Sequence, residues 1–224
     1  NPSAPTSLYS TADLTRWINI ARGQLAGEAE CIRKIGTIST VAGTQVYNFS
    51  GLNTGVAATN GIQGIININQ IFYSVGEGQK RVGAMTWPWF SMYVYNNPVP
   101  EPSWPKYWSQ YGQGAAPGST GAFSGGSFYI NVPDIVYVLN CDCVCYPMPL
   151  TDDATEEAIP FLWTDAVPFL TAYYALMSAQ NNARMGDAMQ YFNMYTKFVE
   201  RARQASNPSM NRWMYSQAGD PAQG

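Results

Sequence analysis

Four acidic residues stand close together ahead of an apolar segment: Asp152, Asp153, Glu156 and Glu157. Paired carboxylates can act as acid and base in glycoside cleavage, with tryptophans stacking on the sugar. Acids at a helix start more often cap its free N–H groups, and Thr151 and Asp153 followed by Glu156 have that spacing. We therefore interpret the cluster as structural, each charge contributing about 0.3–1 kcal/mol at a helix end, and predict no catalytic residue.

Histidine is absent from the 224 residues, which removes the easiest general base near neutral pH and the usual zinc sites. The four cysteines are Cys31 and the alternating set Cys141, Cys143 and Cys145. Residues two apart share one face of a strand, which lacks the turn that lets a cysteine pair converge on a metal. We interpret all four as buried, reduced thiols, with metal binding and disulfide formation as minor alternatives. The sequence predicts no metal, no cofactor and no enzymatic activity.

The composition and net charge of the chain limit the kinds of partner that it can bind. A hydrophobic content of 46% in 224 residues is enough for a substantial core. The formal charge of −3 argues against a protein that wraps nucleic acid, although brief passage of DNA nearby stays compatible with it. The chain has no apolar run of about 18 residues, and the segment Asn1–Pro5 has neither a basic nor an apolar region. We expect no membrane span and no secretion signal.

Four helices are predicted, one near the start of the chain and three in its C-terminal part. Ser10 and Asp13 have capping-box spacing ahead of a helix over residues 11–31, whose outer face carries Arg16, Arg22, Glu28 and Arg33. After the acidic cluster, Pro160 limits the first helix to a short or kinked piece. Apolar residues then recur at helical spacing in a long second helix and in a third helix that ends at Ser206, together forming an antiparallel hairpin. The inward positions are Phe169, Ala172, Tyr173, Leu176 and Ala179, then Met189, Phe192, Phe198, Val199 and Ala202.

Between these helices the pattern changes to that of strands. Residues 35–41 and 44–49 read as one hairpin and residues 65–75 and 81–82 as a second, while 127–132 and 135–145 read as a further pair. A glycine-rich stretch over 112–126 reads as a surface loop. We predict an α+β fold: a discontinuous helical domain over 8–34 plus 150–206, into which an antiparallel β-sandwich or barrel-like domain over 35–149 is inserted.

Residues 87–111 are rich in aromatic side chains and proline, with little regular period. Three interpretations remain open: packing within the domain, a protein–protein interface, and a platform that stacks on sugars. Lys and Glu are scarce throughout residues 35–149, as they are in the core of protein interfaces. The predicted interface residues are Trp87, Trp89, Trp104 and Trp108.

The segment 207–224 is predicted to be an extended C-terminal tail, because its proline and glycine content resists a long helix. Trp213, Met214 and Tyr215 would be poorly soluble if exposed together. Either the tail folds back on its own helices or it docks on another subunit. We single out these three residues as candidates for docking on a portal or a neighbouring subunit.

The order of helix, β insertion and helical pair resembles the head-to-tail adaptor proteins of short-tailed bacteriophages, also called tail-tube or gatekeeper adaptors. The resemblance is carried by Pro149-Leu150-Thr151-Asp152-Asp153, Ile159-Pro160-x-x-Trp163-Thr164-Asp165-Ala166-Val167-Pro168-Phe169, Ala172-Tyr173-Tyr174-Ala175-Leu176 and Ala179-Gln180.

The resemblance implies a structural virion protein at the head–tail interface, present in the host cytoplasm during assembly. It implies a ring of twelve copies beneath the portal that contacts a tail nozzle or tail tube protein. Genomic DNA would pass through its channel without sequence-specific binding, and no membrane is involved. The alternatives are a glycan-binding tail module and another virion connector or ring protein.

Overall fold

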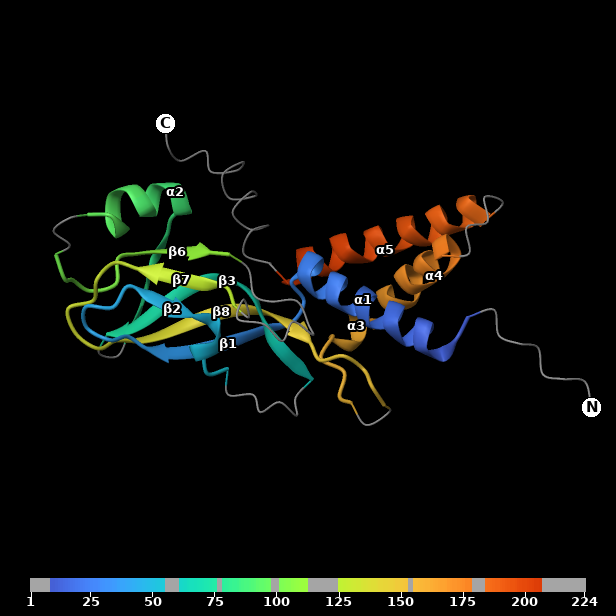
Figure 1. Ribbon diagram of the computed structural model, residues 1–224, viewed down its shortest axis with the longest axis horizontal. Helices are drawn as coiled ribbons and strands as arrows, with labels where there is room; N and C mark the ends of the chain where they lie inside the picture. The colour runs from blue at the N-terminus through green and yellow to red at the C-terminus, as the bar shows by residue number, and fades with distance from the viewer. Residues whose placement is uncertain are drawn as a thin grey trace, which may run out of the picture. The chain divides into compact units, whose positions relative to one another are not determined.

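The computed structural model describes residues 9–54, 61–75, 78–97, 101–112, 125–152, 155–178 and 184–206. The fold is mixed α+β, and the chain separates into two compact units (Figure 1). We call the described residues up to Cys31, together with those from Pro149 onward, the helical unit. Residues Ile32–Met148 form the β unit. Each unit is described by itself.

Helix α1 (Thr11–Ala29) begins and ends at identifiable signals. The Ser10 hydroxyl accepts a hydrogen bond from the Asp13 N–H at 3.1 Å and donates to the Asp13 carboxylate at 2.6 Å, which confirms the predicted cap. The helix ends at Glu30, whose φ of 51° is left-handed. Its C-terminal half buries Leu25 and the alanines beside it.

The helical unit also contains α3 (Phe161–Thr164), α4 (Ala166–Ser178) and α5 (Met185–Ser206). Pro168 lies in the first turn of α4, where no backbone donor is needed, and α5 ends at the predicted Ser206. The ring of Phe169 lies 5.6 Å from that of Phe198, and Tyr173 lies 5.1 Å from Phe192. Later residues of α4 therefore meet earlier residues of α5, and the two helices run antiparallel.

The predicted inward faces of α4 and α5 need correction. The most buried residues of α4 are Ala166, Val167, Leu170 and Ala175, whereas the predicted Phe169, Tyr173 and Leu176 are only half-buried. In α5 the predicted Met189 is exposed, and the most deeply buried aromatic side chain is Tyr195. The reason is that α4 contacts both α1 and α5, so it buries two adjacent stripes rather than one.

The first sheet of the β unit has the order β1 (Arg33–Ser39), β8 (Val138–Pro147), β3 (Ile62–Val75) and β4 (Gly78–Arg81), all antiparallel. Strand β8 is central and is buried on both faces, with Leu139, Cys141, Cys143 and Cys145 on one side and Val144 on the other. The pairing of β3 with β8 shifts register at three places.

The second sheet has the order β2 (Val46–Asn48), β7 (Ser127–Ile130), β6 (Tyr107–Tyr111) and β5 (Gly83–Ala84). Strands β5 and β6 are parallel, so this sheet is mixed rather than antiparallel as predicted. In the described part of the chain neither sheet closes into a barrel. The N–H of Ile68 in β3 donates to the Gln110 side chain in β6 at 3.0 Å and links the two sheets.

Two of the three predicted strand pairs are wrong, because partner choice is not local. Strand β1 pairs with β8 and β2 with β7, while β7 and β8 belong to different sheets. The connection at Thr40 carries the chain from the first sheet to the second, and the Thr40 N–H donates to the Tyr137 carbonyl at 2.8 Å. The hairpin of β3 and β4 is confirmed, with Val75 opposite Gly78.

The aromatic segment is more regular than predicted. It forms α2 (Trp87–Phe90), with Pro88 in its first turn, then a π-helical turn η2 (Ser91–Tyr95), and later strand β6. A short 3₁₀ turn, η1 (Phe49–Gly51), lies earlier in the β unit. Residues 113–124 of the predicted glycine-rich loop lie outside the described residues. Within the described ranges, no helix is both long and apolar enough to span a membrane.

Candidate functional site

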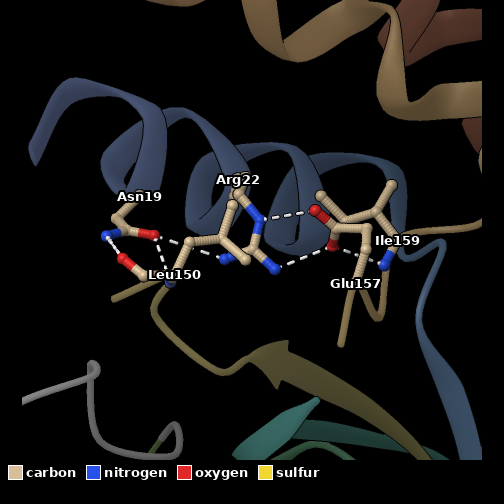
Figure 2. Close-up of polar contacts among 5 residues, drawn as sticks. All are labelled: Asn19, Arg22, Leu150, Glu157 and Ile159. Atoms are coloured by element: carbon tan, nitrogen blue, oxygen red, sulfur yellow. Dashed lines mark hydrogen bonds and ion pairs between the residues drawn. The ribbon is translucent and has the colours of Figure 1, made fainter. Parts of the chain in front are cut away.

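A buried arginine binds Glu157, one member of the acidic cluster (Figure 2). The side chain of Arg22 on α1 is only 1% exposed, although the sequence placed it on an outer face. Its Nε donates to Glu157 Oε2 at 2.9 Å and its Nη2 to Glu157 Oε1 at 2.7 Å, while Nη1 donates to Asn19 Oδ1 at 3.3 Å. The paired donors of a guanidinium match the two oxygens of a carboxylate, which makes this a strong, oriented contact.

Asn19 extends this contact to the start of the following segment. Its Nδ2 donates to the Leu150 carbonyl at 3.0 Å, and its Oδ1 accepts from the Leu150 N–H at 2.8 Å. At the other end, Glu157 Oε1 also accepts from the N–H of buried Ile159 at 2.9 Å (Figure 2). We call Asn19, Arg22, Leu150, Glu157 and Ile159 the arginine clamp. It fastens the segment from Leu150 to Ile159 onto α1.

The clamp corrects the predicted helix start. Residues 155–160 are not helical, α3 begins only at Phe161, and no side chain caps it. Glu157 is engaged by Arg22, and Asp152 accepts from the Thr155 hydroxyl at 2.9 Å, so neither carboxylate caps a helix. Asp153 lies outside the described residues. Glu157 and Asp152 are therefore engaged by side chains of their own unit and not at the helix start that was predicted.

A second polar group joins α1 to α4 and α5. Tyr174 donates to Gln24 Oε1 at 2.6 Å, and Gln24 Nε2 donates to Glu28 Oε1 at 2.7 Å. Tyr195 donates to Glu28 Oε2 at 2.9 Å. Burial, and then the nearby Glu28 charge, raise the pKa of Tyr195 far above its usual range. The hydroxyl therefore stays protonated and acts as a fixed donor rather than as a base.

The four thiols are buried, as predicted. Burial raises the pKa of Cys143 from the ordinary 9.0 to about 12, and those of Cys145 and Cys31 to about 11. A protonated thiol is neither a nucleophile nor a metal ligand at neutral pH. The described residues contain no group of three or more acidic, cysteine or histidine side chains that could hold a metal ion.

A hollow of about 350 Å³ lies in the helical unit beside α4 and α5. Tyr9, Leu176 and Tyr191 line it together with the charged side chains of Arg184 and Asp187. Among the described residues of its lining, Asp187 carries the one carboxylate.

The four tryptophans predicted to form an interface lie in different environments. Trp108 is buried in its own unit, and Trp87 is half-buried, with its ring centroid 4.8 Å from Tyr111 and 4.5 Å from Tyr129. Trp89 and Trp104 are exposed. Of the four predicted interface residues, Trp89 and Trp104 are thus the more exposed and Trp108 is the most buried.

Trp104 has two lysine neighbours that the sequence did not point to. The Nζ atoms of Lys80 and Lys106 lie 5.9 and 5.5 Å from the centroid of its ring. The buried Tyr73 lies 6.1 Å from the same ring. Lys80 is far from Trp104 along the chain, so only the fold brings these residues together.

The predicted docking residues Trp213, Met214 and Tyr215 lie outside the described residues. A comparison of the chain with protein-family models and with curated proteins finds no match.

Proposed function

We propose that the chain is a structural subunit of a bacteriophage virion, a head-to-tail adaptor present as a ring of twelve copies between the portal and the tail nozzle or tail tube. The observation that carries this proposal is the amount of large apolar side chain exposed on each unit. Phe161 and Leu162 of the helical unit are 89% and 73% exposed. Single chains seldom leave contiguous apolar surface in water, and such surface marks contacts with other proteins.

The β unit carries a second apolar surface of this kind. Val41, Ile135, Val136 and Val138 are all about half exposed or more. They adjoin one another, because the Thr40 hydroxyl accepts from the Tyr137 N–H at 2.7 Å and donates to the Ile135 carbonyl at 3.3 Å. A ring held by head-to-tail contacts needs two unlike surfaces on every subunit, and these two apolar surfaces meet that need.

The use of the acidic residues favours a structural role over an enzymatic one. Both carboxylate oxygens of Glu157 accept hydrogen bonds from the buried Arg22 guanidinium, so this side chain is engaged within its own unit rather than presented to a substrate. The resemblance of residues 149–180 to adaptor proteins points the same way. In this role DNA passes through the ring without sequence-specific contacts, and the protein resides in the virion at the head–tail interface.

The finer architecture that we propose is a bundle of α1, α4 and α5 with an inserted β-sandwich. In support, all three pairs of these helices are in contact. The hydrogen bond between Ile68 and Gln110 ties the two sheets together, as in a sandwich.

The test is the copy number of this chain in virions, measured by electron cryomicroscopy, together with assembly of two variants on portal-bearing particles. Phe161→Asp places a charge on the exposed apolar surface and should reduce attachment while the circular dichroism spectrum is unchanged. Gln190→Asp adds the same charge at another exposed helical position and should attach normally. A copy number other than twelve would refute the ring, and equal attachment of the two variants would refute the part assigned to Phe161.

A glycan-binding tail module is the second candidate, favoured by the exposed aromatic side chains of α2 and η2. The ring centroid of Trp89 lies 5.3 Å from that of Tyr93 and 5.6 Å from that of Tyr107, and all three side chains are exposed. Such rings can stack on sugars or on a protein partner. Saturable binding to host surface glycans that is lost in Trp89→Ala would favour this candidate over the adaptor.

A further inference from the structure

The surroundings of Trp104 in the β unit hold two positive charges at one aromatic ring. Lys80 lies in β4, and Lys106 directly precedes β6. Their Nζ atoms lie 5.9 and 5.5 Å from the indole centroid, within the range of cation–π attraction. Trp104 is 46% exposed, so a ligand can reach it.

The backbone around this pair is fixed by a buried side chain. Asn131 Oδ1 accepts from the N–H groups of Lys106 at 2.7 Å and Tyr107 at 3.1 Å. Asn131 Nδ2 donates to the Trp104 carbonyl at 3.1 Å and to the Ser103 hydroxyl at 3.1 Å. Trp104 and Lys106 therefore extend from a backbone held in place, which lowers the entropic cost of binding a ligand.

The two lysines have no internal counter-ion in the described part of the chain. The ion pairs found there are Arg22 with Glu157 and Arg33 with Asp142. The Asp134 carboxylate is engaged by other groups: it accepts hydrogen bonds from the Tyr137 hydroxyl at 2.8 Å and from the Ile135 N–H at 3.0 Å. Two like charges at one ring repel each other, and an external anion relieves that repulsion.

We propose that Lys80, Lys106 and Trp104 form a binding site for the phosphodiester backbone of a nucleic acid. Ammonium groups are compact charges suited to phosphate oxygens, and contacts to phosphate carry no sequence information. Trp104 is the positioning residue that holds the ammonium groups. The site deepens the proposed function, because it rests on that function for the source of the nucleic acid, which is DNA passing through the ring.

The experiment measures binding of a fluorescent duplex DNA of arbitrary sequence to the full chain by anisotropy over a series of salt concentrations. For the double variant K80Q/K106Q, the slope of log K against log salt should fall in magnitude by about 1.8, since each phosphate contact contributes about 0.9. The control K34Q/K197Q removes the same charge from exposed positions and should keep the wild-type slope. Trp104→Ala should weaken binding, and Trp104→Phe should restore it.

Three results would overturn the proposal: no binding of DNA by the wild-type chain, equal slopes for the two double variants, or tighter binding to poly-glutamate than to DNA. The last would identify the site as one for an acidic protein. Failure of this site is distinguishable from failure of the adaptor role. Wild-type chains that join portal-bearing particles in twelve copies but bind no DNA would retain the ring, whereas DNA binding without ring formation would retain the site alone.

Discussion

Replacing Glu157 with glutamine removes the charged partner of a buried guanidinium. The Arg22 side chain is 1% exposed and that of Glu157 is 33% exposed. The glutamine still offers one oxygen to Arg22, but its NH₂ group takes the place of the second oxygen and cannot accept the second hydrogen bond from the guanidinium. We therefore expect Glu157→Gln to lower the free energy of unfolding of the helical unit.

The magnitude follows from the burial of the two partners. Removing one partner of a fully buried ion pair costs about 3–5 kcal/mol. Glu157 is one-third exposed, so water can reach the site, and we expect about 2–3 kcal/mol, in the upper range for hydrogen bonds to a charged group. This exceeds the 0.3–1 kcal/mol expected from the sequence for a charge at a helix end. The exposed Glu156→Gln should change stability by less than about 0.5 kcal/mol.

Urea unfolding followed by far-ultraviolet circular dichroism reports on the long helices, all of which belong to the helical unit. Glu156→Gln is the matched control, because it removes the same charge from the adjacent position. The same Glu157→Gln substitution is then made in a protein that already carries Arg22→Met and so lacks the buried cation. In that background the cost of Glu157→Gln should largely disappear, because no buried charge is left unpaired.

Equal stability of the two glutamine variants would refute this reasoning. So would a full cost for Glu157→Gln in the Arg22→Met background, since the loss would then arise from a contact other than the ion pair.

Two further predictions concern the thiols and the tail. The pKa values of the Cys143 and Cys145 thiols in the folded protein lie above the ordinary 9.0, so the unfolded chain loses these protons first as pH rises. The contribution of the two thiols to the free energy of unfolding should be complete below about pH 9 and decline from there toward pH 11–12. A thiol reagent at neutral pH should modify both cysteines only after urea is added. Deletion of residues 207–224 should leave a folded protein that no longer attaches to portal-bearing particles; unchanged attachment would show that Trp213 and its neighbours do not dock.

The features that could be predicted from the sequence are those that depend on residues close together along the chain. The Ser10 cap, the end of α5 at Ser206 and the hairpin of β3 and β4 each depend on residues within a few positions of one another. The burial of Cys141 could be anticipated in the same way, because a strand rich in small apolar residues fits a central position in a sheet.

Long-range pairing was not accessible from the sequence. Strands β1 and β2 have the alternation of a hairpin, yet each pairs with a strand about 80 or more residues away, because alternation reports on burial and not on partners. Arg22 has the spacing of a surface residue, and its partner Glu157 lies 135 residues later. Lys80 and Trp104 are likewise separated along the chain and are brought together only by the fold.

The discontinuity of the helical unit has a consequence for how the protein is made. A ribosome adds about 5–20 residues per second, so Glu157 follows Arg22 out of the tunnel after an interval on the order of ten seconds. The β unit is contiguous, and all of its residues are synthesised during that wait. Until α4 and α5 follow, α1 lacks the two helices that it contacts in the folded protein. The earliest long helix to be synthesised is thus among the last to be packed, and its buried face stays uncovered while the β unit is made.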